Sequence, residues 1–140
     1  MAGARGSQRV LRAGAGVSVA SDATGGGQER PDRRHAEITP AELVEWQGRG
    51  AQVIDVREEF ELLRGYIPGA RNLPMSRFLE EAGTLGERPV VLVCASGSRS
   101  RSVAEYLIRN GFPSEVANLT DGMVGWREEG RATEGGLEPG

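Results

Sequence analysis

The chain of 140 residues contains one cysteine, one histidine and no lysine, because arginine supplies all 17 of its basic residues. A single cysteine, Cys94, excludes an intramolecular disulfide and a redox cycle that needs a second, resolving thiol. One cysteine and one histidine are also too few for a structural zinc site. We therefore predict neither a disulfide framework nor a bound metal.

Long apolar runs are lacking as well. No stretch approaches the roughly 20 apolar residues of a membrane-spanning helix, so we expect a cytoplasmic protein without a membrane partner. The N-terminal segment carries three arginines before its first acid, Asp22, and in this it weakly resembles a transit peptide. Because Gly14 and Gly16 interrupt its only apolar block, we favour a disordered tail or a misplaced start codon.

Apolar residues are concentrated in the middle of the chain, in short blocks over residues 37–131, and are sparse on either side. This distribution predicts one folded domain over 37–131, large enough for a single core. The Gly/Ala/Arg-rich segment 1–36 and the segment 132–140 are predicted to be disordered tails.

The charged residues are also distributed unevenly between the N-terminal segment and the rest of the chain. Residues 1–36 hold six arginines and three acids, whereas residues 37–140 hold eleven arginines and seventeen acids. A net-acidic domain repels the phosphate backbone of nucleic acids, so we expect no nucleic-acid partner.

Helical and strand patterns alternate along the predicted domain. Thr39 and Glu42 form a capping box at the first helix, with Pro40 at its first position. Phe60 and Leu63 are expected on one side of the second helix. Predicted helices cover residues 40–48, 58–64, 75–82, 102–110 and 123–129, and predicted strands cover residues 52–56, 71–73, 89–93 and 114–119.

Continuous apolar strands that alternate with helices indicate strands buried on both faces. We therefore predict an α/β fold with an open parallel sheet of about five short strands and helices on both faces. Functional crevices of such sheets lie beyond the carboxyl ends of the strands. Cys94 directly follows the most apolar strand, residues 89–93, and precedes a helix, so it occupies such a position.

The segment CASGSRS, which begins at Cys94, has the composition of an anion-binding loop. Small residues allow successive backbone N–H groups to converge, and the next helix adds its positive end. We predict a lowered pKa for Cys94, a cradle that also suits a persulfide, and an oxyanion site at Arg99. The structural alternative is that Ser96 and Ser98 are ordinary turn residues and that Ser100 is a helix N-cap. Capping and anion binding use the same N–H groups, so both interpretations can hold. The candidate loop residues after the cysteine are Ala95, Ser96, Gly97, Ser98, Arg99 and Ser100.

Three ordered segments of the chain resemble the rhodanese-like domain family. CASGSRS matches the family's active loop, in which four residues separate Cys from Arg and Ser follows. DVREEFELLRGYIPGARNLP (residues 55–74) and LTDGMVGWREEG (residues 119–130) resemble its first and closing signatures. The resemblance implies a sulfurtransferase that moves sulfane sulfur from a donor such as thiosulfate to a thiophilic acceptor.

The resemblance also assigns roles to individual residues. Cys94 would be the nucleophile that forms the persulfide, and Arg99 with the N–H groups of residues 95–100 would bind donor and persulfide. Asp55 and Arg57 would support the loop. The alternative is that the Asp55 carboxylate only caps a turn and that Arg57 is solvated. The chain departs from the family pattern at two positions, with Tyr66 in place of the usual histidine and Asp121 in place of the usual second glycine.

A rhodanese-type mechanism requires no metal or organic cofactor. Its partners would be a small-molecule sulfur donor and an acceptor: cyanide in vitro, and a thiol or dithiol in vivo, including thioredoxin-like or sulfur-carrier proteins. Three alternatives remain at this stage. The first is a phosphatase or arsenate reductase on the same fold, whose loop has five residues between Cys and Arg. The others are a non-catalytic regulatory domain on a rhodanese scaffold and a redox sensor at Cys94.

Overall fold

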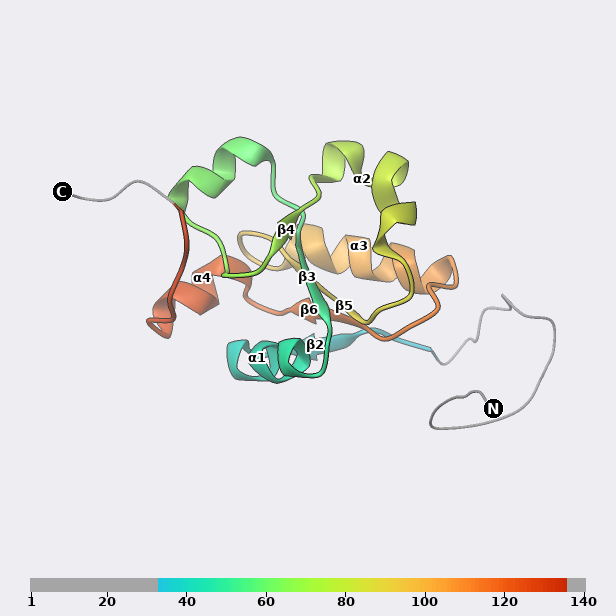
Figure 1. The fold of residues 1–140 in the computed structure, drawn as a ribbon, viewed down its shortest axis with the longest axis horizontal. Helices are drawn as coiled ribbons and strands as arrows, with labels where there is room; N and C mark the ends of the chain where they lie inside the picture. The colour runs from blue at the N-terminus through green and yellow to red at the C-terminus, as the bar shows by residue number, and fades with distance from the viewer. Residues whose placement is uncertain (1–32, 136–140) are drawn as a thin grey trace. The chain divides into compact units, whose positions relative to one another are not determined.

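The computed structural model describes residues 33–135, shown in colour in Figure 1. The strands are β2 (Ala36–Ile38), β3 (Gln52–Asp55), β4 (Arg71–Asn72), β5 (Val90–Val93) and β6 (Val116–Leu119). The α-helices are α1 (Pro40–Gly48), α2 (Met75–Glu81), α3 (Ser98–Arg109) and α4 (Gly122–Glu128), and the 3-10 helices are η1 (Glu59–Arg64) and η2 (Ala82–Leu85). No helix within 33–135 is long and apolar enough to cross a membrane.

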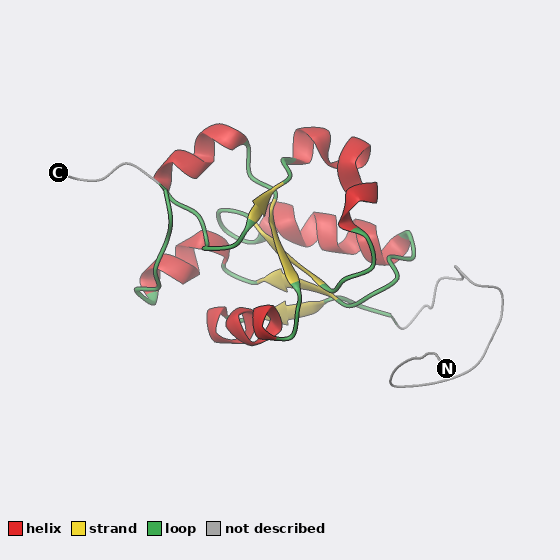
Figure 2. Ribbon diagram, viewed as in Figure 1, coloured by secondary structure: helices red, strands yellow, loops and turns green. Residues whose placement is uncertain are grey.

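The strands form one parallel sheet in the order β2-β6-β5-β3-β4, with helices on both of its sides (Figure 2). The predicted α/β fold and parallel sheet are therefore confirmed. The patterning did not predict β2, because its three residues are too few to show a period. β2 pairs along the edge of the sheet with β6, from Ala36 opposite Ala117 to Ile38 opposite Leu119.

The central strand β5 supplies both hydrophobic cores. Its side chains alternate across the sheet, so Val90 and Leu92 join the core beneath α2 and α3, whereas Val91 and Val93 join the core beneath α1 and α4. All four are fully buried, and each stabilises the fold by about 1.5–3 kcal/mol relative to an exposed side chain. The end of β5 is consequently one of the most firmly held points of the sheet.

The first helix begins as predicted, with a complete capping box. The Glu42 N–H donates to Thr39 Oγ1 at 3.1 Å, and the Thr39 N–H donates to Glu42 Oε1 at 2.9 Å. The predicted second helix instead forms as the 3-10 helix η1, and it buries none of its residues. Phe60 is 73% exposed and Leu63 is 58% exposed, so hydrophobic packing does not hold this segment.

Helix α3 begins at Ser98, four residues before the predicted start. The Arg101 N–H donates to the Gly97 carbonyl at 3.0 Å, which closes the first helical turn inside the candidate loop. Ser98, Arg99 and Ser100 offer no apolar periodicity, and this explains why the pattern placed the helix too late. The first turn of the helix is therefore part of the loop around Cys94.

The described structure extends four residues beyond each end of the predicted domain, over residues 33–36 and 132–135. At the C-terminal side, Tyr66 and Glu134 form an antiparallel bridge, and Trp126 Nε1 donates to the Ala132 carbonyl at 2.9 Å. Tyr66 thus holds the C-terminal segment by its backbone, and its ring lies against Gly135. The rest of the predicted tails, residues 1–32 and 136–140, lies outside the described residues.

We predict that residues 132–135 contribute measurably to stability. A chain that ends after Arg131 should unfold with a free energy about 2–4 kcal/mol lower than one that ends after Gly135, because it loses three hydrogen bonds. Urea unfolding followed by tryptophan fluorescence and circular dichroism would measure the difference. Equal stabilities of the two chains would show that the Tyr66–Glu134 bridge contributes nothing.

Candidate active site

Cys94 lies directly after the central strand β5, at the carboxyl edge of the sheet, and its side chain is buried. Its Sγ accepts hydrogen bonds from the Gly97 N–H at 3.1 Å and the Ser100 N–H at 3.3 Å. The Ser100 hydroxyl oxygen lies 3.3 Å from the same sulfur. The Ser100 N–H belongs to the first turn of α3, where the backbone donors have no partner inside the helix. The sulfur takes the place of that missing partner.

The loop closes this tightly because residue 97 is glycine. Gly97 has a φ of 99°, a conformation that L side chains rarely adopt. A Cβ at this position would lie 1.9 Å from the Thr120 carbonyl oxygen. The close approach of the segment after β6 thus requires glycine and fixes the point at which α3 begins.

A second helix, α4, binds the start of the loop. Its first N–H groups are free to donate outward, and those of Met123 and Val124 donate to the carbonyls of Cys94 at 2.9 Å and Ala95 at 3.0 Å. Gly122, with a φ of 57°, leaves no room for a Cβ, which would lie 2.3 Å from the Cys94 carbonyl oxygen. Asp121, the departure from the family pattern, is the exposed N-cap of this helix.

Burial and hydrogen bonding act on the Cys94 thiol in opposite directions. Burial alone raises its pKa because it disfavours the thiolate. Hydrogen bonds to the sulfur, among them those from the backbone N–H groups of Ser100, Gly97 and Ser96, outweigh burial and bring the pKa of Cys94 below its ordinary value. The arrangement therefore favours a thiolate, the form of cysteine that reacts as a nucleophile.

Arg99 lies at the side of the loop and is paired with Glu61 of η1. Its Nη1 and Nη2 donate to the two carboxylate oxygens at 2.8 and 2.9 Å, a bidentate ion pair. Hydrogen bonds from Arg99 are the largest influence on Glu61 and lower its pKa to about 2. The sequence-based reasoning missed Glu61, which lies 38 positions away from Arg99 and forms no local motif with it.

Asp55 and Arg57 form a buried ion pair that supports η1. Arg57 Nη2 donates to Asp55 Oδ2 at 2.7 Å, and the Arg57 N–H donates to Asp55 Oδ1 at 3.1 Å, so the carboxylate does cap a turn. Arg57 is not solvated, however: it is 2% exposed and also donates to the carbonyls of Glu61 and Gly65. None of the hydrogen bonds described for these two side chains ends on residues 94–100. Their connection to the loop runs through Glu61, whose carbonyl accepts from Arg57 and whose carboxylate accepts from Arg99.

The remaining predicted loop residues, Ala95, Ser96 and Ser98, are less buried than Cys94. Ser96 and Ser98 are exposed and Ala95 is half-buried. Ser96 contributes its backbone N–H to the sulfur, whereas Ser98 opens α3. Within 33–135, no three His, Cys, Asp or Glu side chains are grouped as a metal site would require.

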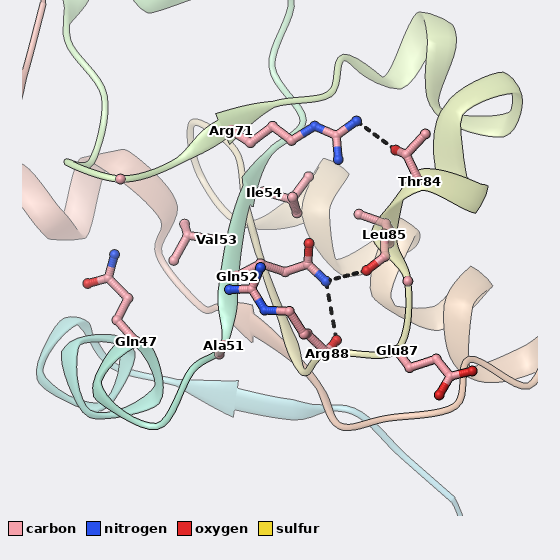
Figure 3. A pocket seen from close by; sticks show the side chains of 12 residues that line it. Gln47, Ala51, Gln52, Val53, Ile54, Arg71, Thr84, Leu85, Glu87 and Arg88 are labelled. Atoms are coloured by element: carbon pink, nitrogen blue, oxygen red, sulfur yellow. Dashed lines mark hydrogen bonds between the residues drawn. The ribbon is translucent and has the colours of Figure 1, made fainter.

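A polar cavity of about 470 Å³ lies at the other end of the sheet, by the amino ends of β3 and β5. Figure 3 shows that, among the residues that line it, Gln52 is hydrogen-bonded to the carbonyls of Leu85 and Arg88, and Arg71 to Thr84. No residue of the Cys94 loop lines this cavity. The cavity is therefore separate from the Cys94 loop, which lies at the carboxyl edge of the sheet.

Known proteins of similar sequence and structure include sulfurtransferases and rhodanese-related proteins. The thiosulfate sulfurtransferase GlpE of Pseudomonas aeruginosa is 34% identical over 93 residues, which cover 64% of this chain and 82% of GlpE. The uncharacterized protein YqhL of Bacillus subtilis is 40% identical over 79 residues, which cover 56% of this chain and 62% of YqhL. Among solved structures, the rhodanese-related protein of Thermoplasma volcanium superimposes with a TM-score of 0.65 at 31% identity, over 71% of this chain and 98% of that one.

The family model of the rhodanese-like domain matches residues 39–129, which are more than half of the sequence and include every strand except β2. The matched segment contains Cys94, its loop and both helices that bind the loop. The chain belongs to the rhodanese-like domain family.

Proposed function

We propose that this protein is a sulfurtransferase that carries sulfane sulfur as a persulfide on Cys94. The observation that carries the proposal is the convergence of backbone N–H donors from the loop and from the first turn of α3 on the sulfur of the chain's only cysteine. Relatives named thiosulfate sulfurtransferase support the same activity.

The proposed reaction is a double displacement. The Cys94 thiolate attacks the outer sulfur of thiosulfate, a new S–S bond forms, and the S–S bond of thiosulfate breaks as sulfite leaves with the electron pair. An acceptor then attacks the outer sulfur of the enzyme persulfide, and the Cys94 thiolate leaves. Cyanide becomes thiocyanate in this step, and a thiolate acceptor becomes a persulfide.

Backbone donors suit each stage of this cycle. In the resting enzyme they stabilise the charge on Sγ, and after sulfur transfer the N–H groups of the same loop would stabilise the charge on the outer sulfur. Such preorganised donors contribute roughly 3–4 kcal/mol each to reactions in which a charge develops at a fixed point. The Arg99 guanidinium, at the side of the loop, would attract the sulfite oxygens of the donor.

The phosphatase alternative is less well supported. Four residues separate Cys94 from Arg99, whereas the phosphatases and arsenate reductases that this loop resembles have five. A shorter loop makes a narrower ring of donors, which suits one sulfur atom better than a tetrahedral phosphoryl group. Thiosulfate:cyanide sulfurtransfer assayed beside phosphatase activity would separate the two functions.

Replacement of Cys94 by serine should abolish sulfurtransfer and leave the fold intact, because a hydroxyl cannot accept the sulfane sulfur. Wild-type protein treated with thiosulfate should gain the mass of one sulfur atom, and Cys94→Ser protein treated in the same way should gain none. Intact-mass spectrometry and the cyanide assay would measure both effects. Turnover by the serine variant would eliminate the persulfide mechanism.

The Glu61–Arg99 pair should tune the affinity for an anionic donor. Arg99→Ala should raise the KM for thiosulfate about tenfold, because a charge-assisted contact is lost. Glu61→Gln removes the competing carboxylate and should lower the KM about two- to fivefold at low salt, an effect that added salt should diminish.

Glu59→Gln is the matched control for this comparison, since Glu59 is an exposed acid of the same helix η1. It should leave the KM within twofold of wild type. A KM that rises in Glu61→Gln as much as in Arg99→Ala would mean that Arg99 needs its ion pair to hold its position, and that the carboxylate does not compete with the donor.

A further inference from the structure

A fully buried polar pair, Ser100 and Asn118, lies behind the sulfur of Cys94, and both residues are 0% exposed. Ser100 belongs to the first turn of α3, and Asn118 belongs to β6. The Ser100 hydroxyl oxygen lies 3.3 Å from Cys94 Sγ, 3.3 Å from the Gly97 carbonyl oxygen and 2.5 Å from Asn118 Oδ1. A hydroxyl has a single hydrogen, so these three acceptors compete for it.

The orientation of the Asn118 amide is determined by its other contacts. Its Nδ2 donates to Glu37 Oε1 at 3.0 Å and to the Gly97 carbonyl oxygen at 3.2 Å. A carboxylate and a carbonyl can only accept hydrogen bonds, so a flipped amide would place Oδ1 against two oxygens. Asn118 Oδ1 must therefore face Ser100, and because it carries no hydrogen, the Ser100 hydroxyl has to supply one.

Glu37, on the edge strand β2, remains an acceptor. Burial raises its pKa, but the hydrogen bonds around its carboxylate outweigh burial and bring the pKa below its ordinary value. The groups that bond to it, besides Asn118, are the side chains of His35, Thr120 and Arg101. An ionised Glu37 thus holds the Asn118 amide in one orientation.

We infer that Asn118, oriented by Glu37, is a positioning residue that draws the Ser100 hydroxyl hydrogen away from the sulfur of Cys94. Its contact with the hydroxyl is the shortest of the three, and loss of that contact would leave a buried amide oxygen without a donor. The thiolate then depends on backbone N–H groups alone, and the hydroxyl oxygen accepts the S–H hydrogen when the sulfur is protonated. This inference deepens the proposed function, on which its catalytic meaning rests.

In the proposed cycle this arrangement favours the sulfur-loaded enzyme. Free thiolate carries its charge on Sγ, whereas the persulfide carries it on the outer sulfur and leaves Sγ neutral. When the Ser100 hydroxyl donates to Asn118 and not to Sγ, the free thiolate is stabilised less. The persulfide loses nothing, because its Sγ is neutral. The equilibrium of sulfur loading should therefore lie further toward the persulfide than it would with a hydroxyl that served the thiolate.

The test is the pH profile of Cys94 alkylation by iodoacetamide, which reports on one residue because the chain has one cysteine. Ser100→Ala should not raise the midpoint of the profile. Asn118→Leu frees the Ser100 hydroxyl to donate to the sulfur. At pH values well below the midpoint, the alkylation rate as a fraction of its plateau value should therefore increase about tenfold, which is the effect of one hydrogen bond to a charged group. Ser100→Ala in the Asn118→Leu background should reverse that increase.

Thr120→Val is the control, because the Thr120 hydroxyl donates to the same Glu37 oxygen at 2.9 Å and does not bond to Ser100. Its profile should match wild type. A midpoint that rises with Ser100→Ala in the wild-type background would overturn the inference, and this variant decides the matter even if Asn118→Leu does not fold. Alkylation requires no sulfurtransfer, so a protein inactive with thiosulfate that still gave these profiles would contradict the proposed function alone.

Discussion

The turn from β5 into α3 places the Cys94 sulfur, whose pKa is lowered, at the junction of a buried strand and the first turn of a helix. Burial of an ion costs several kcal/mol, and here donors that the helix cannot use internally offset that cost. The geometry depends on two glycines, since Thr120 approaches too closely for a side chain at residue 97, and the Cys94 carbonyl approaches too closely for one at Gly122. The loop is consequently clamped between the segment after β6 and the start of α4, and each contact around the sulfur depends on that clamp.

The segment beside the loop is held by charge rather than by apolar packing. Helix η1 buries none of its residues, and the buried Arg57 donates to the carbonyls of Glu61 in this helix and of Gly65, its C-cap. Removal of one partner of such a buried ion pair typically costs about 3–5 kcal/mol, so Asp55 and Arg57 depend strongly on each other. Arg57 donates to the Glu61 carbonyl, and the Glu61 carboxylate pairs with the Arg99 guanidinium. A chain of contacts thus connects the DVR triplet to Arg99 of the loop.

Local patterns in the sequence were sufficient for the fold and for the position of Cys94 at the end of the central strand. The capping box at Thr39, the apolar run before Cys94 and the small residues after it are all short-range signals, and each corresponds to what the structure shows. The ion pair of Glu61 with Arg99 and the bond between Asn118 and Glu37 join residues 38 and 81 positions apart. Such contacts arise only when the sheet assembles, and single polar residues carry no periodicity that would reveal them. The same holds for β2, whose three residues become a strand because β6 is available beside it.

In the proposed arrangement, two contacts limit the stabilisation of the Cys94 thiolate: Glu61 pairs with the Arg99 guanidinium, and Asn118 competes for the Ser100 hydroxyl hydrogen. The chemistry gives a reason for such moderation. The intrinsic reactivity of a thiolate falls as its pKa falls, with a Brønsted coefficient of about 0.4–0.5, and the best attacking thiol has a pKa near the ambient pH. In the proposed reaction, once the thiolate is the predominant form, each further hydrogen bond to the sulfur would slow its attack on thiosulfate without increasing the thiolate population. The backbone N–H groups are fixed by the fold and cannot be reduced in number. Side chains such as Glu61 and Asn118 can therefore adjust the pKa of Cys94 against the reactivity of its thiolate.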